Sequence, residues 1–104
     1  MHMKKILVVC TSGLGTSLAM RGYLEKFIME NNLNVKVEHA DVGSANFYET
    51  DLIIGAKQVI DCLPEHSLIE IIRLEDIVNR QYIKQQLLNS ETIQSWLTEK
   101  EGIR

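Results

Sequence analysis

The chain has 104 residues, of which 45% are hydrophobic and 24% charged, and this predicts a single globular domain over residues 1–104. The formal net charge of -3 argues against nucleic acid as the main partner. No apolar run is long enough to cross a bilayer, and no signal peptide is visible. The two cysteines do not make a disulfide framework, so we expect a reduced, cytoplasmic protein.

The first third of the chain predicts a strand, a helix and a second strand. Lys4–Val9 is continuously apolar after two lysines, which is typical of a central strand of a parallel sheet. The next apolar residues recur at helical spacing: Met20, Leu24, Phe27 and Ile28. We expect this helix to be capped at Thr16 or Ser17 and to end near Glu30. Val35–His39 alternates apolar and polar residues, which predicts a half-buried strand at an edge.

Two further strands follow with a short helix between them. The polar stretch 41–50 reads as a loop, and Leu52–Ile54 as a short strand that ends at Gly55. Ala56–Leu63 has room for about two helical turns before Pro64. The fourth strand is expected over Leu68–Ile72.

The last third reads as helix, from Asp76 or Asn79 through Leu97, with a break and a new cap at Ser90. Trp96 and Leu97 are expected to cover the sheet or the preceding helix. Strands that alternate with helices predict an α/β fold with a parallel sheet. We describe residues from about 90 to 104 as a C-terminal helical extension.

One stretch between the first strand and the first helix carries candidate chemistry. It consists of Cys10, Thr11, Ser12, Gly13, Leu14, Gly15, Thr16 and Ser17. Glycines that adopt positive φ at positions 13 and 15 would curl the backbone, so that its amides and the helix N-terminus bind an anion. A cysteine there should have a lowered pKa and act as a nucleophile. The alternative is a small buried cysteine before an ordinary tight turn.

Ligands of a parallel sheet bind beyond the carboxyl ends of its strands. Cys10 lies at such an end, so we expect three other segments to border the same site: 41–50, 55–58 and 73–76.

The remaining candidate residues are weaker. Cys62 is interpreted as a buried or partly buried packing residue. His2, His39 and His66 lack metal-ligand spacing, so no metal is expected. Two alternatives stay open for Arg21, which either attracts a phosphorylated partner or lies on a solvated helix face. His39 either approaches the Cys10 loop or is an ordinary edge-strand residue.

The stretch from Ile6 to Ser17 resembles the phosphocysteine loop of enzyme IIB components of the bacterial sugar phosphotransferase system. Within these, the ascorbate and galactitol type is closest, because residues 40–43 read Ala-Asp-Val-Gly and residues 51–54 read Asp-Leu-Ile-Ile. The resemblance implies a four-stranded parallel sheet with helices on both faces, similar to low-molecular-weight tyrosine phosphatases.

The resemblance also implies a phosphoryl-transfer cycle that needs no cofactor. Phosphohistidine on a IIA partner donates its phosphoryl group to Cys10, and a carbohydrate held by a membrane IIC partner then accepts it. The residues of the loop, Thr11 to Ser17, would supply donors to the phosphoryl oxygens. The chain would thus associate with the inner face of the membrane through IIC.

The phosphatases of similar architecture end their cysteine loop with arginine and serine, whereas here Thr16 and Ser17 occupy those places. No Asp-Pro pair offers a general acid either. These absences favour a carrier over an enzyme that hydrolyses the phosphoryl group. Two alternatives are a phosphatase-like enzyme and a thiol-based regulatory module.

Overall fold

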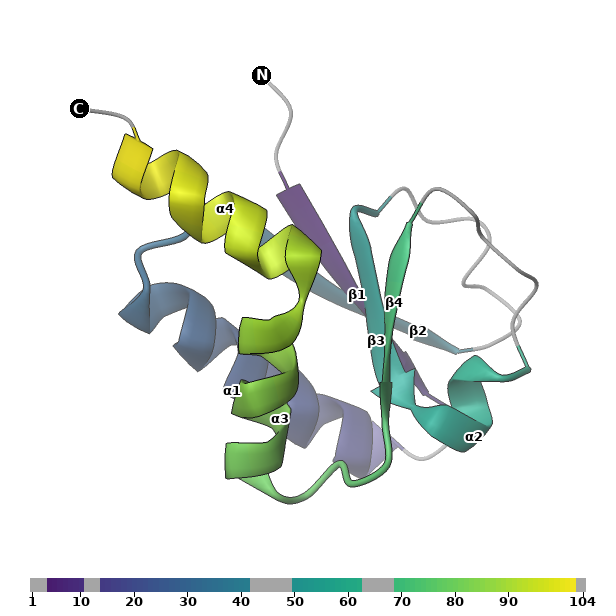
Figure 1. The fold of residues 1–104 in the computed structure, drawn as a ribbon. Coiled ribbons are helices and arrows are strands. Elements are labelled where there is room, and N and C mark those ends of the chain that lie inside the picture. The colour runs from purple at the N-terminus through teal and green to yellow at the C-terminus, as the bar shows by residue number, and fades with distance from the viewer. Residues whose placement is uncertain (1–3, 11–13, 42–49, 63–68, 103–104) are drawn as a thin grey trace.

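The structure is a computed structural model that describes residues 4–10, 14–41, 50–62 and 69–102. Along these residues the elements are β1 (Lys4–Cys10), α1 (Leu14–Glu30), β2 (Val35–Asp41), β3 (Leu52–Ala56), α2 (Lys57–Ile60), β4 (Glu70–Leu74), α3 (Arg80–Asn89) and α4 (Glu91–Gly102). The strands form a parallel sheet in the order β2-β1-β3-β4 (Figure 1). This confirms the predicted four-stranded α/β fold and the edge position of β2.

The larger part of the core lies between the sheet and helices α1, α3 and α4 (Figure 1). Alternate residues of a strand point to the same face, so Ile6 and Val8 of β1 both enter this core. The predicted apolar residues of α1 are all buried here: Met20, Leu24, Phe27 and Ile28. Trp96 is also buried in this cluster and Leu97 packs against it, which confirms the covering role expected for both.

The opposite face of the sheet carries a smaller core. Leu7 and Val9 of β1 and Ile53 of β3 pack there with Ile60 of α2. Helices therefore lie on both faces of the sheet, as predicted. The second face is covered less, because α2 runs only from Lys57 to Ile60. The expected two turns shorten to one because β3 continues through Gly55 and Ala56 before the helix begins.

Helix α1 ends at Glu30, as predicted, and Asn31 and Asn32 follow it in a left-handed turn. Asn32 has a φ of 54°, a conformation that asparagine tolerates better than most residues. The N–H of Leu33 donates to the carbonyl of Ile28 at 2.9 Å, and the N–H of Asn32 donates to that of Met29 at 3.1 Å. This pair of bonds is a Schellman motif, which satisfies carbonyls that the helix end leaves free.

The junction between α3 and α4 is tied to the start of β4. Ser90 caps α4 as predicted, because its Oγ accepts from the N–H of Ile93 at 3.2 Å. The same hydroxyl donates to Glu70 Oε1 at 2.7 Å, and the N–H of Thr92 donates to that oxygen at 2.9 Å. Burial opposes ionisation of Glu70, but the bonds from Thr92 and Ser90 outweigh it and lower the pKa of the carboxyl. Strand β4 covers Glu70–Leu74, two residues later than expected, because it pairs with β3 from Leu52 to Ala56.

Helix α3 begins one residue after Asn79, which is the later of the two predicted starts. The side chain of Asn79 accepts from the N–H of Tyr82 at 3.1 Å and so caps the helix. No helix in the described residues is both long and apolar enough to span a membrane.

Candidate functional site

The carboxyl ends of the four parallel strands form one edge of the sheet, and Cys10 is the last residue of β1 at that edge. Thr11, Ser12 and Gly13 lie outside the described residues, and α1 starts immediately after them at Leu14. The backbone therefore has the strand, short connection and helix that an anion loop requires. The role of each residue in binding stays a prediction.

The first turn of α1 contains Leu14, Gly15, Thr16 and Ser17. The predicted cap at Thr16 or Ser17 is therefore wrong, since both residues are already helical. Hydroxyl residues are tolerated there because the first amides of a helix have no intrahelical acceptor. Unpaired amides and the positive end of the helix dipole favour a bound anion at the start of a helix.

Gly15 does not curl the backbone in the predicted way. No described glycine has a positive φ, and Gly15 is helical. The prediction that this position needs positive φ is therefore wrong. The reason is that α1 begins earlier than expected and takes Gly15 into its first turn. Gly13, for which the same conformation was predicted, lies outside the described residues.

A different glycine, Gly55, is constrained by close packing beside Cys10. It pairs with Val9 across β1 and β3. A Cβ at this position would lie 2.6 Å from the carbonyl oxygen of Val9 and 3.1 Å from Cδ1 of Ile60. Only glycine therefore lets β3 and α2 approach the residue before Cys10 this closely. The sequence analysis treated Gly55 only as a strand end; the glycine inside an apolar run was the available signal.

The segment 41–50 borders the Cys10 edge at one end only. Asp41 is the last residue of β2, is exposed, and is the register partner of Cys10. Residues 42–49 lie outside the described part. Thr50 lies at the opposite edge, because its hydroxyl donates to the carbonyl of Lys5 near the start of β1 at 3.0 Å. The expectation that the whole segment borders the site is therefore wrong at Thr50.

The other two bordering segments meet through an exposed ion network. Arg73 of β4 is the register partner of Gly55, and its Nε lies 3.3 Å from Asp61 Oδ1. Lys57, the first residue of α2, lies 3.8 Å from the other oxygen of Asp61. Exposed pairs of this kind contribute little to stability. Their place next to the carboxyl ends of β3 and β4 agrees with the expected positions of 55–58 and 73–76.

Asp76 organises the connection between β4 and α3. Its Oδ1 accepts from the N–H of Val78 at 2.8 Å and from the N–H of Asn79 at 3.0 Å. These two bonds lower the pKa of the Asp76 carboxyl. The residue therefore shapes the turn that leads into α3.

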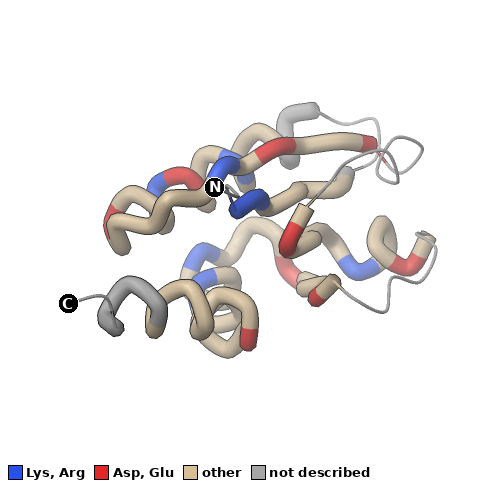
Figure 2. The backbone as a smooth tube through the Cα atoms, turned by 90° about the horizontal axis from the view of Figure 1, so that it is seen from above, with Lys and Arg blue, Asp and Glu red and all other residues tan. Residues whose placement is uncertain are grey.

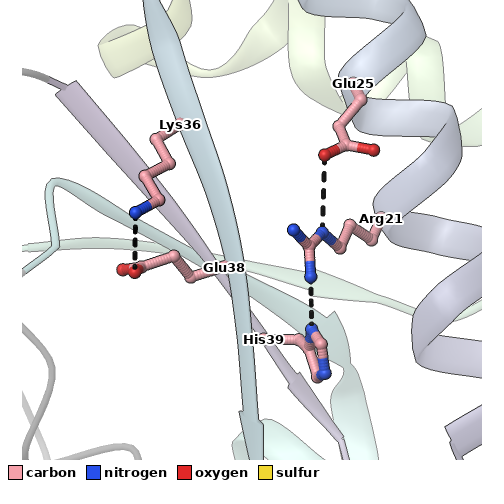
Figure 3. A network of polar contacts seen from close by, with 5 residues as sticks. All are labelled: Arg21, Glu25, Lys36, Glu38 and His39. Carbon is pink, nitrogen blue, oxygen red and sulfur yellow. Dashed lines mark hydrogen bonds and ion pairs between the residues drawn. The ribbon is translucent and has the colours of Figure 1, made fainter.

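Arg21 and His39 lie together on the α1 side of β2 (Figure 3). Arg21 Nη1 lies 3.0 Å from His39 Nδ1, and Arg21 Nε lies 3.4 Å from Glu25 Oε2. The side chain of Arg21 is 35% exposed and is held by both neighbours, so it does not simply lie on a solvated helix face. The alternative, that Arg21 attracts a phosphorylated partner, stays a prediction. On the other face of β2, Lys36 lies 3.7 Å from Glu38 (Figure 3).

Cys62 is exposed, so its interpretation as a buried packing residue is wrong. Helix α2 ends at Ile60, which is the residue that packs on the sheet. Cys62 falls in the following turn, where its Sγ contacts the carbonyl of Gln58 at 3.5 Å. His2 and His66 lie outside the described residues.

Charges of both signs alternate over the described chain and do not gather on one side (Figure 2). Within those residues, no three His, Cys, Asp or Glu side chains come together in a group suited to a metal ion.

Comparison with known proteins agrees with the chemistry suggested by the loop. A family model described as PTS system, Lactose/Cellobiose specific IIB subunit matches residues 5–89. The matched range contains Cys10 and every element from β1 to α3. Its description names the lactose and cellobiose type, so it does not support the ascorbate and galactitol type that the resemblance implied. No curated protein matches the chain.

Proposed function

Because the chain belongs to the family of IIB subunits of the sugar phosphotransferase system, we propose that Cys10 carries the phosphoryl group between two partner proteins. Family membership makes the chain a phosphotransferase component of sugar transport and a phosphocarrier. The observation that carries the assignment to Cys10 is its position at the end of β1, shortly before the first turn of α1.

In the first step, the thiolate of Cys10 attacks the phosphorus of a phosphohistidine on a IIA partner. The S–P bond forms, the P–N bond breaks and the imidazole leaves. Charge develops on the equatorial phosphoryl oxygens, and phosphoryl transfer depends mainly on alignment and stabilisation of that charge. We assign this role to the amides of the connection and of the first turn of α1, from Thr11 to Ser17.

In the second step, a carbohydrate hydroxyl attacks the phosphocysteine. The S–P bond breaks, an O–P bond forms, the hydroxyl loses its proton, and Cys10 leaves as a thiolate. Water must not replace the sugar in this step. Thr16 stands where the related phosphatases place arginine, and threonine lacks the bidentate guanidinium that would stabilise attack by water.

The partners follow from the two steps: a IIA phosphodonor, and a membrane IIC protein that holds the sugar at the inner face of the membrane. For the sugar, we propose an ascorbate- or galactitol-like carbohydrate, on the resemblance of residues 40–43 and 51–54 to that type. The description of the family model favours lactose or cellobiose instead. Transfer assays with these four sugars and the cognate IIC distinguish the two classes.

The decisive experiment is phosphorylation with phosphoenolpyruvate, the general phosphotransferase proteins and the cognate IIA, followed by mapping of the phosphate by mass spectrometry. We expect label on Cys10 in the wild type and none after Cys10→Ala. Cys62→Ala is the matched control, because Cys62 is an exposed thiol, and it should be labelled like the wild type.

Two results would contradict the proposal. One is phosphate mapped to His39 or Cys62 in the wild-type chain. The other is rapid release of inorganic phosphate without sugar that Cys10→Ala abolishes, since this would indicate a phosphatase.

A further inference from the structure

The pairing of Arg21 and His39 joins two elements that are distant in sequence. Arg21 lies in α1 and His39 in β2, and the contact between Nη1 and Nδ1 is 3.0 Å long and partly buried (Figure 3). A second contact, from Arg21 Nε to Glu25, holds the same guanidinium along its own helix. Two fixed contacts restrict a side chain that would otherwise sample many rotamers.

The chemistry of this contact assigns a protonation state to His39. A guanidinium has donors and no acceptor, so the imidazole must accept at Nδ1. His39 is therefore neutral in this arrangement and carries its proton on Nε2. Protonation of the ring would remove the acceptor and place two cations side by side.

The register of the sheet places this pair close to Cys10. His39 pairs with Val8, and Asp41, two residues later, pairs with Cys10. With a rise of about 3.3 Å per residue and about 4.8 Å between strands, the Cα atoms of His39 and Cys10 are about 8 Å apart. The Arg21 guanidinium contacts the ring of His39, and the Debye length at physiological ionic strength is about 8 Å, so screening does not remove all of its field over a distance of this order.

We propose that Arg21, held by His39, is a positioning residue that attracts the anionic phosphoryl group to Cys10. The proposal rests on the proposed function and deepens it. The guanidinium acts through the field at the carboxyl edge, since its direct partners are His39 and Glu25. It supplies part of the positive charge that the missing loop arginine would provide in a phosphatase, at a distance that does not clamp the oxygens.

The charged groups that face His39 come from two elements. Arg21 and Glu25 lie on α1, and Asp41 shares the face of His39 because side chains alternate along β2. The neighbouring residue of β1 is Val8, which carries no charge.

Alkylation of Cys10 tests this field without any partner protein. Iodoacetate and iodoacetamide both react with the thiolate, so the ratio of their rates cancels the thiolate fraction and reports the local charge. Measurements use a Cys62→Ser background, because Cys62 is an exposed thiol that would also react. We expect Arg21→Gln to lower the iodoacetate-to-iodoacetamide ratio by about two- to four-fold, which is the effect of one charge near 10 Å in a partly aqueous medium.

Lys26→Gln is the matched control, since it removes the same charge from an exposed position of α1 farther along the helix. The iodoacetate-to-iodoacetamide ratio of Lys26→Gln should stay close to that of the parent. An equal fall in both variants, or no fall in Arg21→Gln, overturns the proposal. The phosphorylation assay is separate: if wild-type Cys10 accepts no phosphoryl group while Arg21→Gln still lowers the ratio, the proposed function fails and the charge effect stands.

The role of His39 is tested by two substitutions. His39→Gln retains an acceptor for Arg21 and should keep the parent's ratio of alkylation rates, whereas His39→Leu removes the acceptor and should lower that ratio. In transfer from IIA, Arg21→Gln should raise KM more than it lowers kcat. Equal ratios in His39→Gln and His39→Leu would contradict the assignment.

Discussion

Replacement of Gly55 by alanine should damage both stability and reactivity at Cys10. The added Cβ would lie 2.6 Å from the carbonyl oxygen of Val9, a distance that real Cβ atoms essentially never show. Ile60 can move its side chain slightly, but the carbonyl belongs to the backbone of β1 and can move only if β1 and β3 separate. Overpacking of this kind costs about 1–3 kcal/mol.

The same substitution at Gly22 is the matched control. Gly22 lies in α1, and its Cβ would meet nothing within 4 Å. Gly22→Ala should therefore stabilise the chain by about 0.5–1 kcal/mol, because alanine is the better helix former. The two variants add the same methyl group and should change the free energy of unfolding in opposite directions.

Urea unfolding followed by circular dichroism measures the change in the free energy of unfolding for both variants. In thermal unfolding, each kcal/mol corresponds to about 4–8 °C in Tm for a domain of this size. Gly55→Ala should also slow phosphoryl acceptance, because Val9 directly precedes Cys10. If Gly55→Ala unfolds at the wild-type urea concentration and accepts phosphate at the wild-type rate, the inference from close packing is wrong.

Two further predictions concern the ends of helices. Glu70→Gln should destabilise the chain by about 1 kcal/mol at pH 7, since the charged acceptor at the start of α4 is lost. The lowered pKa of Glu70 means that its contribution is present above the ordinary value of 4.5 and is lost as pH falls through the folded value. The difference between wild type and variant in urea titrations should therefore shrink as pH falls below 4.5, and a constant difference would contradict this account. Asn32→Val should lower the Tm by several degrees, because a β-branched residue is strained at a φ of 54°, whereas Asn32→Gly should not.

Patterns that are local in the sequence predicted most of the fold. The helical spacing of Met20, Leu24 and Phe27 identified the buried face of α1, and the hydroxyl of Ser90 identified the start of α4. The features that were missed depend on residues far apart in the chain. The bounds of β4 depend on its pairing with β3, and the exposure of Cys62 follows from how far β3 extends.

The candidate site could be predicted only in part for the same reason. The position of Cys10 follows from a local strand and helix, whereas the contact between Arg21 and His39 depends on how α1 lies across β2. No spacing in the sequence encodes that contact. The close packing at Gly55 could not be predicted either, because it involves the carbonyl of Val9 on the neighbouring strand.

Helix α4 lies beyond the matched family range, but it packs on the same core as the matched elements. That range ends at residue 89, which is the last residue of α3, yet Ile93 and Trp96 of α4 are buried in the main core. Helix α4 lies toward the start of β1, away from the edge where Cys10 ends that strand (Figure 1). The buried Ile93 and Trp96 therefore give α4 a role in the stability of the core, at the end of the sheet opposite the edge where phosphoryl transfer is proposed.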